Sequence, residues 1–128
     1  MAERLFVALH ALPGDRVLLS GDGLSYTAAM LLMEVDRLAS RLRRHGGRVL
    51  AVLADNGPHW VAADLAALKA GVTHLPLPGF FNKAQLQHAL QTATADLLLT
   101  DQVARIGGLE LGFREIGKWN GLALLSRD

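Results

Sequence analysis

The stretch LKAGVTHLPLP, residues 68–78, decides the fold of this chain. A helical pattern stops at Gly71, because glycine readily takes the left-handed conformation in which many helices end. A short apolar strand follows at once, VTHLPL, residues 72–77. Pro76 and Pro78 then remove two backbone donors where a strand would still use them. The stretch therefore predicts a helix, a strand and a fixed feature of the chain after that strand.

Upstream lies a second strand and the beginning of the same helix. RVLAVLA, residues 48–54, is a continuous apolar run, which is typical of a strand covered on both faces of a parallel sheet. Asn56 can cap the helix that follows, and Pro58 suits its first turn, where a missing N–H costs nothing. We expect this helix to end at Gly71.

Downstream the alternation continues with a helix over about residues 83–92 and a strand, ADLLLT, residues 95–100. Two consecutive βαβ units with short connections predict an α/β fold, with a parallel sheet flanked by helices. After Asp101 the pattern weakens. The runs LGFREI, residues 111–116, and GLALLS, residues 121–126, are expected to form marginal edge strands.

The N-terminal part adds a hairpin and a long helix. RVLLSGDGLSY, residues 16–26, places two apolar runs around Gly21, Asp22 and Gly23, which favours a small β-hairpin. Residues 27–45 then predict an amphipathic helix, ended by Gly46 and Gly47. Its apolar positions recur at helical spacing: Ala28, Leu31, Val35, Leu38 and Leu42.

Composition limits the class of protein. With 128 residues, 51% of them apolar and 20% charged, the chain suits one domain over residues 1–128, or one piece of a larger domain. A net charge of +1 gives no reason to expect a nucleic-acid partner. The start, MAERLFVALHALPGDR, is a poor secretory signal, and no apolar run approaches the ~20 residues that span a bilayer. The absence of cysteine suits a reducing compartment. We expect a cytoplasmic location.

The sequence contains no pattern typical of a phosphate-binding loop or of a serine nucleophile. GDGLS, residues 21–25, and HGGRV, residues 45–49, lack the lysine and spacing of a P-loop, and no G-x-G-x-x-G opens a helix after a strand. Ser25, Ser40 and Ser126 lack the G-x-S-x-G turn of serine hydrolases. Turns and helix caps explain these residues better.

The histidines show no pairing that indicates zinc: His10, His45, His59, His74 and His88. His74 differs from the rest because it lies in a strand that we expect to be buried. A core or strand-end histidine with satisfied hydrogen bonds explains it better than a catalytic one, although its role stays open.

The segment RLASRLRRHGGR, residues 37–48, concentrates five arginines. Binding of nucleic acid or nucleotide phosphate is conceivable. A solvated helix face explains the arginines better, with Arg43 and Arg44 near the negative end of the helix dipole. Four aromatic residues allow either an apolar pocket or, more commonly, core packing: Trp60, Phe80, Phe81 and Trp119.

Two stretches resemble a known family. LSYTAAM, residues 24–30, and LKAGVTHLPLP, preceded by ADNGPHWVAADLAA at residues 54–67, resemble the first two core motifs of the adenylate-forming superfamily. This superfamily includes AMP-forming acyl-CoA and aryl-CoA synthetases, luciferases and the adenylation domains of peptide synthetases. An F-x-x-x-x-L-x-x-x-L helix at residues 81–90 also fits, and the resemblance covers about residues 16–101.

The resemblance implies an N-terminal subdomain in which the two prolines turn the chain out of the sheet. It also implies an intact enzyme that uses ATP and magnesium to activate an acyl or aryl acid, with CoA or a carrier thiol as acceptor. Ala28 departs from the family, which often has glutamate there, so Ser25 or Thr27 is expected to cap the helix. The sequence ends at Asp128, before the family's phosphate loop and catalytic lysine. We therefore expect no catalytic, cofactor-binding or metal-binding residue in this chain.

Two functions stay open from the sequence. The first is a scaffold segment of an ATP-dependent, AMP-forming ligase, inactive by itself. The second is a free-standing α/β module for interaction or nucleotide binding, without catalysis. In a fragment, open sheet edges and apolar faces favour self-association.

Overall fold

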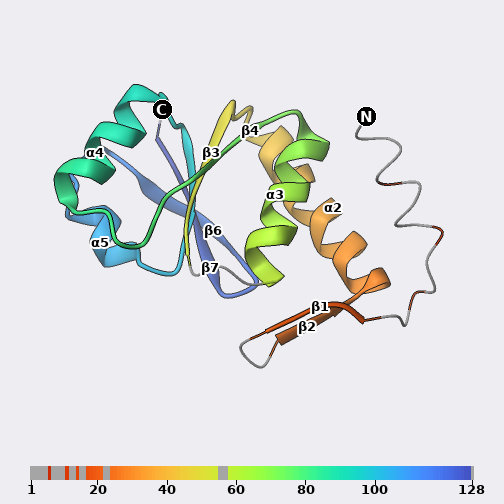
Figure 1. Ribbon diagram of the computed structural model, residues 1–128. Helices are drawn as coiled ribbons and strands as arrows, with labels where there is room; N and C mark the ends of the chain where they lie inside the picture. Colours follow the sequence, from red (N-terminus) through yellow and green to blue (C-terminus); the bar gives the residue numbers. More distant parts are fainter. Residues whose placement is uncertain are drawn as a thin grey trace.

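The computed structural model describes residues 6, 11, 14, 17–21, 24–54 and 58–127 (Figure 1). Its elements follow in chain order: β1 (Val17–Gly21), β2 (Leu24–Thr27), α2 (Ala28–Arg44), β3 (Val49–Leu53), α3 (Pro58–Ala70), β4 (Thr73–Pro76), α4 (Lys83–Thr92), β5 (Leu97–Thr100), α5 (Val103–Gly107), β6 (Arg114–Trp119) and β7 (Leu122–Ser126). Each predicted helix and strand has a counterpart within a few residues. The predicted turn residues Asp22 and Gly23, and the predicted cap Asn56, lie outside the described residues.

A five-stranded sheet forms the centre, in the order β4-β3-β5-β7-β6. Strand β3 pairs in parallel with both β4 and β5, which confirms the predicted βαβ units. Strands β1 and β2 pair antiparallel in a separate two-stranded sheet, which confirms the hairpin. The fold class is therefore α/β, as the sequence predicts, with an antiparallel extension on one side.

That extension corrects one prediction. Strand β7 is no marginal edge strand: it pairs antiparallel with β5 on one side and β6 on the other, and its residues Leu122–Leu125 are buried. Of the two strands of this hairpin, only β6 lies at an edge of the sheet. The turn between them carries Asn120 and Gly121, both at positive φ, which is the conformation of a tight two-residue hairpin. This Asn-Gly pair is a strong hairpin signal that the sequence analysis missed.

Two layers of helices cover the two faces of the sheet (Figure 1). Helices α2 and α3 pack on one face, around Val35, Leu38 and Leu42. Helices α4 and α5 pack on the other face, around Leu86, Leu90 and Ile106. Because both faces are covered, the central strands are apolar throughout, as the continuous run of β3 predicts.

The helix ends follow the expected chemistry. Thr27 caps α2, and its hydroxyl accepts the backbone N–H of Met30 at 3.2 Å. Gly71 has a φ angle of +73°, which confirms the predicted left-handed glycine after α3, and Gly46 after α2 is also left-handed, with φ of +65°. Asn82 and Gln85 form a reciprocal capping box at the start of α4.

The proline stretch lies at the margin of the sheet. Strand β4 is an edge strand, and Pro76 aligns with Val52 of β3. The next residue, Leu77, still donates its N–H to the carbonyl of Val52 at 2.9 Å. Proline is tolerated there because an edge strand needs donors on one side only.

Candidate functional site

The carboxyl edge of the parallel strands is the first place to look for a site, because open α/β sheets bind ligands there. Strands β3 and β5 end side by side at Leu53 and Thr100, and Thr100 aligns with Ala123 of β7. The turn between β6 and β7 therefore lies at the same edge, and α3 begins there at Pro58. Residues 55–57 of this edge lie outside the described part.

Tyr26 is the central polar side chain at this edge. Its ring is buried, and its hydroxyl accepts a 2.7 Å hydrogen bond from the side-chain amide of Asn120. Its ring meets the His59 ring edge-on, with 6.5 Å between centroids. Burial, with a smaller contribution from the charge of Glu34, raises the pKa of Tyr26 to about 12. Tyr26 is therefore a neutral hydrogen-bonding group near pH 7.

Two buried polar atoms close to Tyr26 have no partner among the described residues: Nδ1 of His59 and Oε2 of Glu34. The other carboxylate oxygen of Glu34 accepts a 2.9 Å hydrogen bond from Arg37. The indole of Trp119 donates to the backbone carbonyl of Glu34 at 3.2 Å. Sequence reasoning missed this polar group, although Tyr26 and His59 both stand in the two quoted motifs.

Other polar groups at the carboxyl edge bind the chain's own backbone. The buried Thr100 hydroxyl donates to the carbonyl of Leu53 at 2.7 Å and accepts the N–H of Gln102 at 2.9 Å. Arg105 donates to the carbonyls of Gly79 and Phe81, and so fixes the loop after β4. These side chains therefore stabilise the loops at this edge of the sheet.

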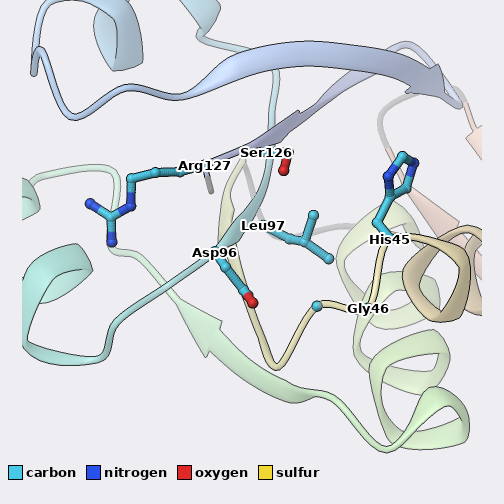
Figure 2. A pocket seen from close by; sticks show the side chains of 7 residues that line it. His45, Gly46, Asp96, Leu97, Ser126 and Arg127 are labelled. Atoms are coloured by element: carbon cyan, nitrogen blue, oxygen red, sulfur yellow. The ribbon is translucent and has the colours of Figure 1, made fainter.

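A cavity of about 280 Å³ lies at the opposite, amino end of β3 and β5. Figure 2 shows Leu97 directed into it and Arg127 directed away. Its lining residues are His45, Gly46, Gly47, Asp96, Leu97, Ser126 and Arg127. The carboxylate of Asp96 accepts the N–H groups of Arg48 and Val49 at 3.0–3.1 Å. Arg127 donates to the carbonyl of Ala95 at 2.9 Å. Both charged side chains hydrogen-bond to backbone atoms of the chain itself. Their role is therefore to stabilise this end of the sheet.

His74 has one paired and one unpaired ring nitrogen. Its Nδ1 lies 2.7 Å from Oδ1 of Asp64, and its ring lies 5.1 Å from that of Trp60. Its Nε2 is buried without a partner among the described residues. Within the described part of the chain, only one of the two ring nitrogens of this histidine is therefore hydrogen-bonded. The expectation that its strand is buried is wrong, because β4 is a partly exposed edge strand.

Core packing, the favoured expectation for the four aromatic residues, is confirmed for three of them. Trp60 and Trp119 pack with the core on the α2–α3 side, whereas Phe81 packs on the other side. Phe80 is 84% exposed. Core packing therefore accounts for three of the four aromatic residues, which divide between the two faces of the sheet.

Part of the arginine segment does converge. Arg37, Arg41 and Arg44 line a second cavity, of about 400 Å³, together with Ser40, Lys118 and Trp119. Arg43 instead donates to the carbonyl of Lys69 at 2.9 Å. The arginine-bearing face of α2 is thus partly solvated surface, as predicted, and partly the wall of a cationic hollow.

The AMP-binding enzyme family matches residues 6–116 of this sequence. The chain belongs to this family. Among curated relatives in it, a plipastatin synthase protein of Bacillus subtilis is 36% identical over 99 residues, which is 75% of this chain and 4% of that protein. The chain thus spans a small fraction of the curated relatives that it matches.

Solved structures agree with the family at the level of the fold. The anthranilate CoA ligase AuaEII, in complex with anthranoyl-AMP, superposes with a TM-score of 0.77 at 14% identity, over 85% of this chain and 22% of that one. The NpsA N-terminal subdomain of Klebsiella oxytoca gives a TM-score of 0.70 at 24% identity, over 80% and 26% of the two chains.

AMP-binding enzymes depend on ATP, which brings magnesium with it, and both groups need particular donors from the protein. Phosphate groups are bound by backbone N–H donors and cationic side chains, and a magnesium ion requires oxygen ligands. No group of three histidine or acidic residues comes together in the described part of the chain. Asp96 and Thr100 are already engaged with backbone. These two side chains therefore offer no free ligand to the nucleotide or the metal. No described helix is long and apolar enough to cross a bilayer.

Proposed function

We propose that this chain, as one α/β unit over residues 1–128, is the N-terminal framework of a ligase domain that activates a carboxylic acid as its acyl-adenylate. The single observation that carries the proposal is the agreement of fold and family over most of the chain with adenylation domains and CoA ligases. The chain contributes a packed sheet, two helical layers and the loops that these fix.

Framework suits the polar chemistry of the chain. Joining a carboxylate to the α-phosphorus of ATP needs cations and N–H donors around the transferring group, usually with magnesium. Asp96, Thr100 and Arg105 instead bind backbone atoms of their own chain. We therefore propose that the chain itself holds no catalytic, cofactor-binding or metal-binding residue and is inactive by itself.

The substrates that we propose for the whole enzyme are an acyl or aryl acid, ATP with magnesium, and a thiol acceptor. The relatives offer two acceptors. One solved neighbour is an adenylation–PCP di-domain and another is a CoA ligase, which supports a carrier thiol and CoA respectively. The reaction itself is the same up to the adenylate.

The test begins with the gene. The reading frame beyond Asp128 is expected to encode a Ser/Thr/Gly-rich phosphate loop and a distant lysine. The purified product of that whole frame should then exchange pyrophosphate into ATP only when its acid is added. Product analysis with CoA and with a carrier protein separates the two acceptors. A stop codon after Asp128, with no companion gene, would favour the free-standing module instead.

We also propose that the isolated chain self-associates and is cytoplasmic. The edge strands β4 and β6 and the exposed Phe80 support self-association, since open edges and apolar side chains pair with other copies. A concentration-dependent rise in sedimentation coefficient is expected, whereas a single monomer boundary at high concentration would refute self-association.

Cell fractionation tests the proposed cytoplasmic location, which the absence of cysteine supports.

A further inference from the structure

The outer face of α2 carries a continuous stripe of exposed side chains. Met30, Met33, Arg37, Ser40 and Arg44 follow one another at alternating intervals of three and four residues, so they lie on one side of the helix. Met30 and Met33 are 42% and 53% exposed, and the Arg37 side chain is 65% exposed. The stripe is apolar at its amino end and cationic at its carboxyl end.

A cationic hollow adjoins the carboxyl end of this stripe. It is the cavity of about 400 Å³ between α2 and β6, with Lys118 on the strand side. Its floor is fixed in two ways. The Arg41 guanidinium lies against Gly117 and donates to the carbonyl of Lys118, and the Trp119 indole donates to the carbonyl of Glu34. The hollow is therefore built into the packing of the helix on the sheet.

The charges around the hollow are only partly compensated. Arg37 pairs with Glu34 at 2.9 Å, and Lys118 pairs with Glu115 at 3.3 Å. The Arg44 side chain makes no ion pair or hydrogen bond within the described residues. The lining holds four cations and no carboxylate. Such an arrangement attracts an anionic group, because like charges facing one hollow repel one another until a counter-charge enters.

We propose that the α2 stripe and its cationic hollow bind an acidic, amphipathic segment of a partner protein. Carboxylates of the segment occupy the hollow, and its apolar side chains lie over Met30 and Met33. Methionine suits such a contact because its flexible side chain adapts to different partners. A nucleic acid fits less well, since its affinity depends on many phosphate contacts, whereas this hollow has four cations in a chain of net charge +1.

The proposal is tested by binding to two defined polymers, poly-L-glutamate and a glutamate–tyrosine copolymer, measured in the absence of ATP and acid. The copolymer should bind more tightly at equal ionic strength, because it offers both charge and apolar area. Arg44→Glu should weaken both by at least about tenfold. Lys83→Glu is the matched control: the same charge change at an exposed residue of α4, across the sheet, should change affinity by less than about twofold.

Two further variants separate the halves of the surface. Met33→Gln should abolish the advantage of the copolymer and leave poly-L-glutamate binding unchanged. Lys118→Gln should weaken both polymers, which keeps the test decisive if Arg44→Glu fails to fold by circular dichroism. Equal losses in Arg44→Glu and Lys83→Glu, or no binding of either polymer, would overturn the proposal. So would a 12-nucleotide polyuridylate that binds more tightly than both polymers and is lost in Arg44→Glu. Because no ATP is present, these outcomes do not depend on the proposed ligase reaction.

Discussion

The side-chain amide of Asn120 donates a 2.7 Å hydrogen bond to the hydroxyl of Tyr26. This bond joins the end of the N-terminal hairpin to the turn of the last hairpin, 94 residues later in the chain. The two partners lie at the carboxyl edge of the sheet. Tyr26 belongs to β2, which pairs with β1, whereas Asn120 lies in the turn between the paired strands β6 and β7. Tyr26 therefore reports on whether β2 and the β6–β7 turn are packed together.

The ionisation of Tyr26 is the first prediction. The pKa of the free side chain is 10.0, and that of the buried one is about 12. Because the folded state holds the proton more tightly, the stability linked to Tyr26 is intact below pH 10 and is lost as the pH rises from 10 to 12. Tyr26 is the only tyrosine, so its ultraviolet absorbance follows the ionisation directly. A midpoint near the free value while the far-ultraviolet spectrum stays native would contradict the burial; Tyr26→Phe gives the blank.

Gly71 gives a second prediction. Its φ of +73° suits glycine, and nothing lies within 4 Å of where a Cβ would stand. The effect of Gly71→Ala is therefore backbone strain alone, about 1–2 kcal/mol of lost unfolding free energy, and Gly71→Val should lose more. Gly79→Ala is the control, because Gly79 has equal space and no positive φ. Urea unfolding should show it neutral or slightly stabilised; equal losses at both positions would argue against the strain.

Asp96 gives a third prediction. Its carboxylate accepts the N–H groups of Arg48 and Val49 and so fixes the start of β3. Asp96→Ala should cost about 1–2 kcal/mol, since a bond to a charged acceptor is worth about 1.5–3 kcal/mol and water partly replaces it here. The exposed Asp101 is the control, and Asp101→Ala should stay within about 0.5 kcal/mol of the parent. Indistinguishable urea midpoints would contradict the role of Asp96.

Thr100 gives a fourth prediction. Thr100→Val keeps the shape of the side chain but leaves the carbonyl of Leu53 and the N–H of Gln102 without their partner. The free energy of unfolding should fall by about 1–3 kcal/mol. Thr73→Val, on the exposed edge strand, should change it little or raise it. Calorimetric melting of the two variants side by side decides the point, and a larger loss at Thr73 would be inconsistent with this account.

The core of the fold could be predicted from the sequence because local signals coincide there. The apolar run of β3, the cap at Thr27 and the glycine at Gly71 each act within a few residues, and all three agree with the structure. The position of β7 could not be read in the same way. Its place between β5 and β6 depends on pairing with β5, from which α5 and β6 separate it in the chain, although the Asn120–Gly121 turn signalled its hairpin.

The polar groups were less predictable than the fold. Asn120 and Tyr26 meet through tertiary packing, and no spacing in the sequence indicates their contact. The arginines of α2 were readable as a helix face, yet their hollow exists only because β6 brings Lys118 beside them. Side chains that act across distant segments thus escape reasoning from local pattern.

The central claim is that this chain is a framework without reactive groups of its own. The most direct test is isotope exchange between pyrophosphate and ATP by the purified 128-residue chain, with a panel of amino, aryl and fatty acids and magnesium present. A mock purification from cells without the gene accounts for host ligases. The account predicts exchange no greater than in that mock sample for every acid. Acid-dependent exchange by the chain alone would contradict it.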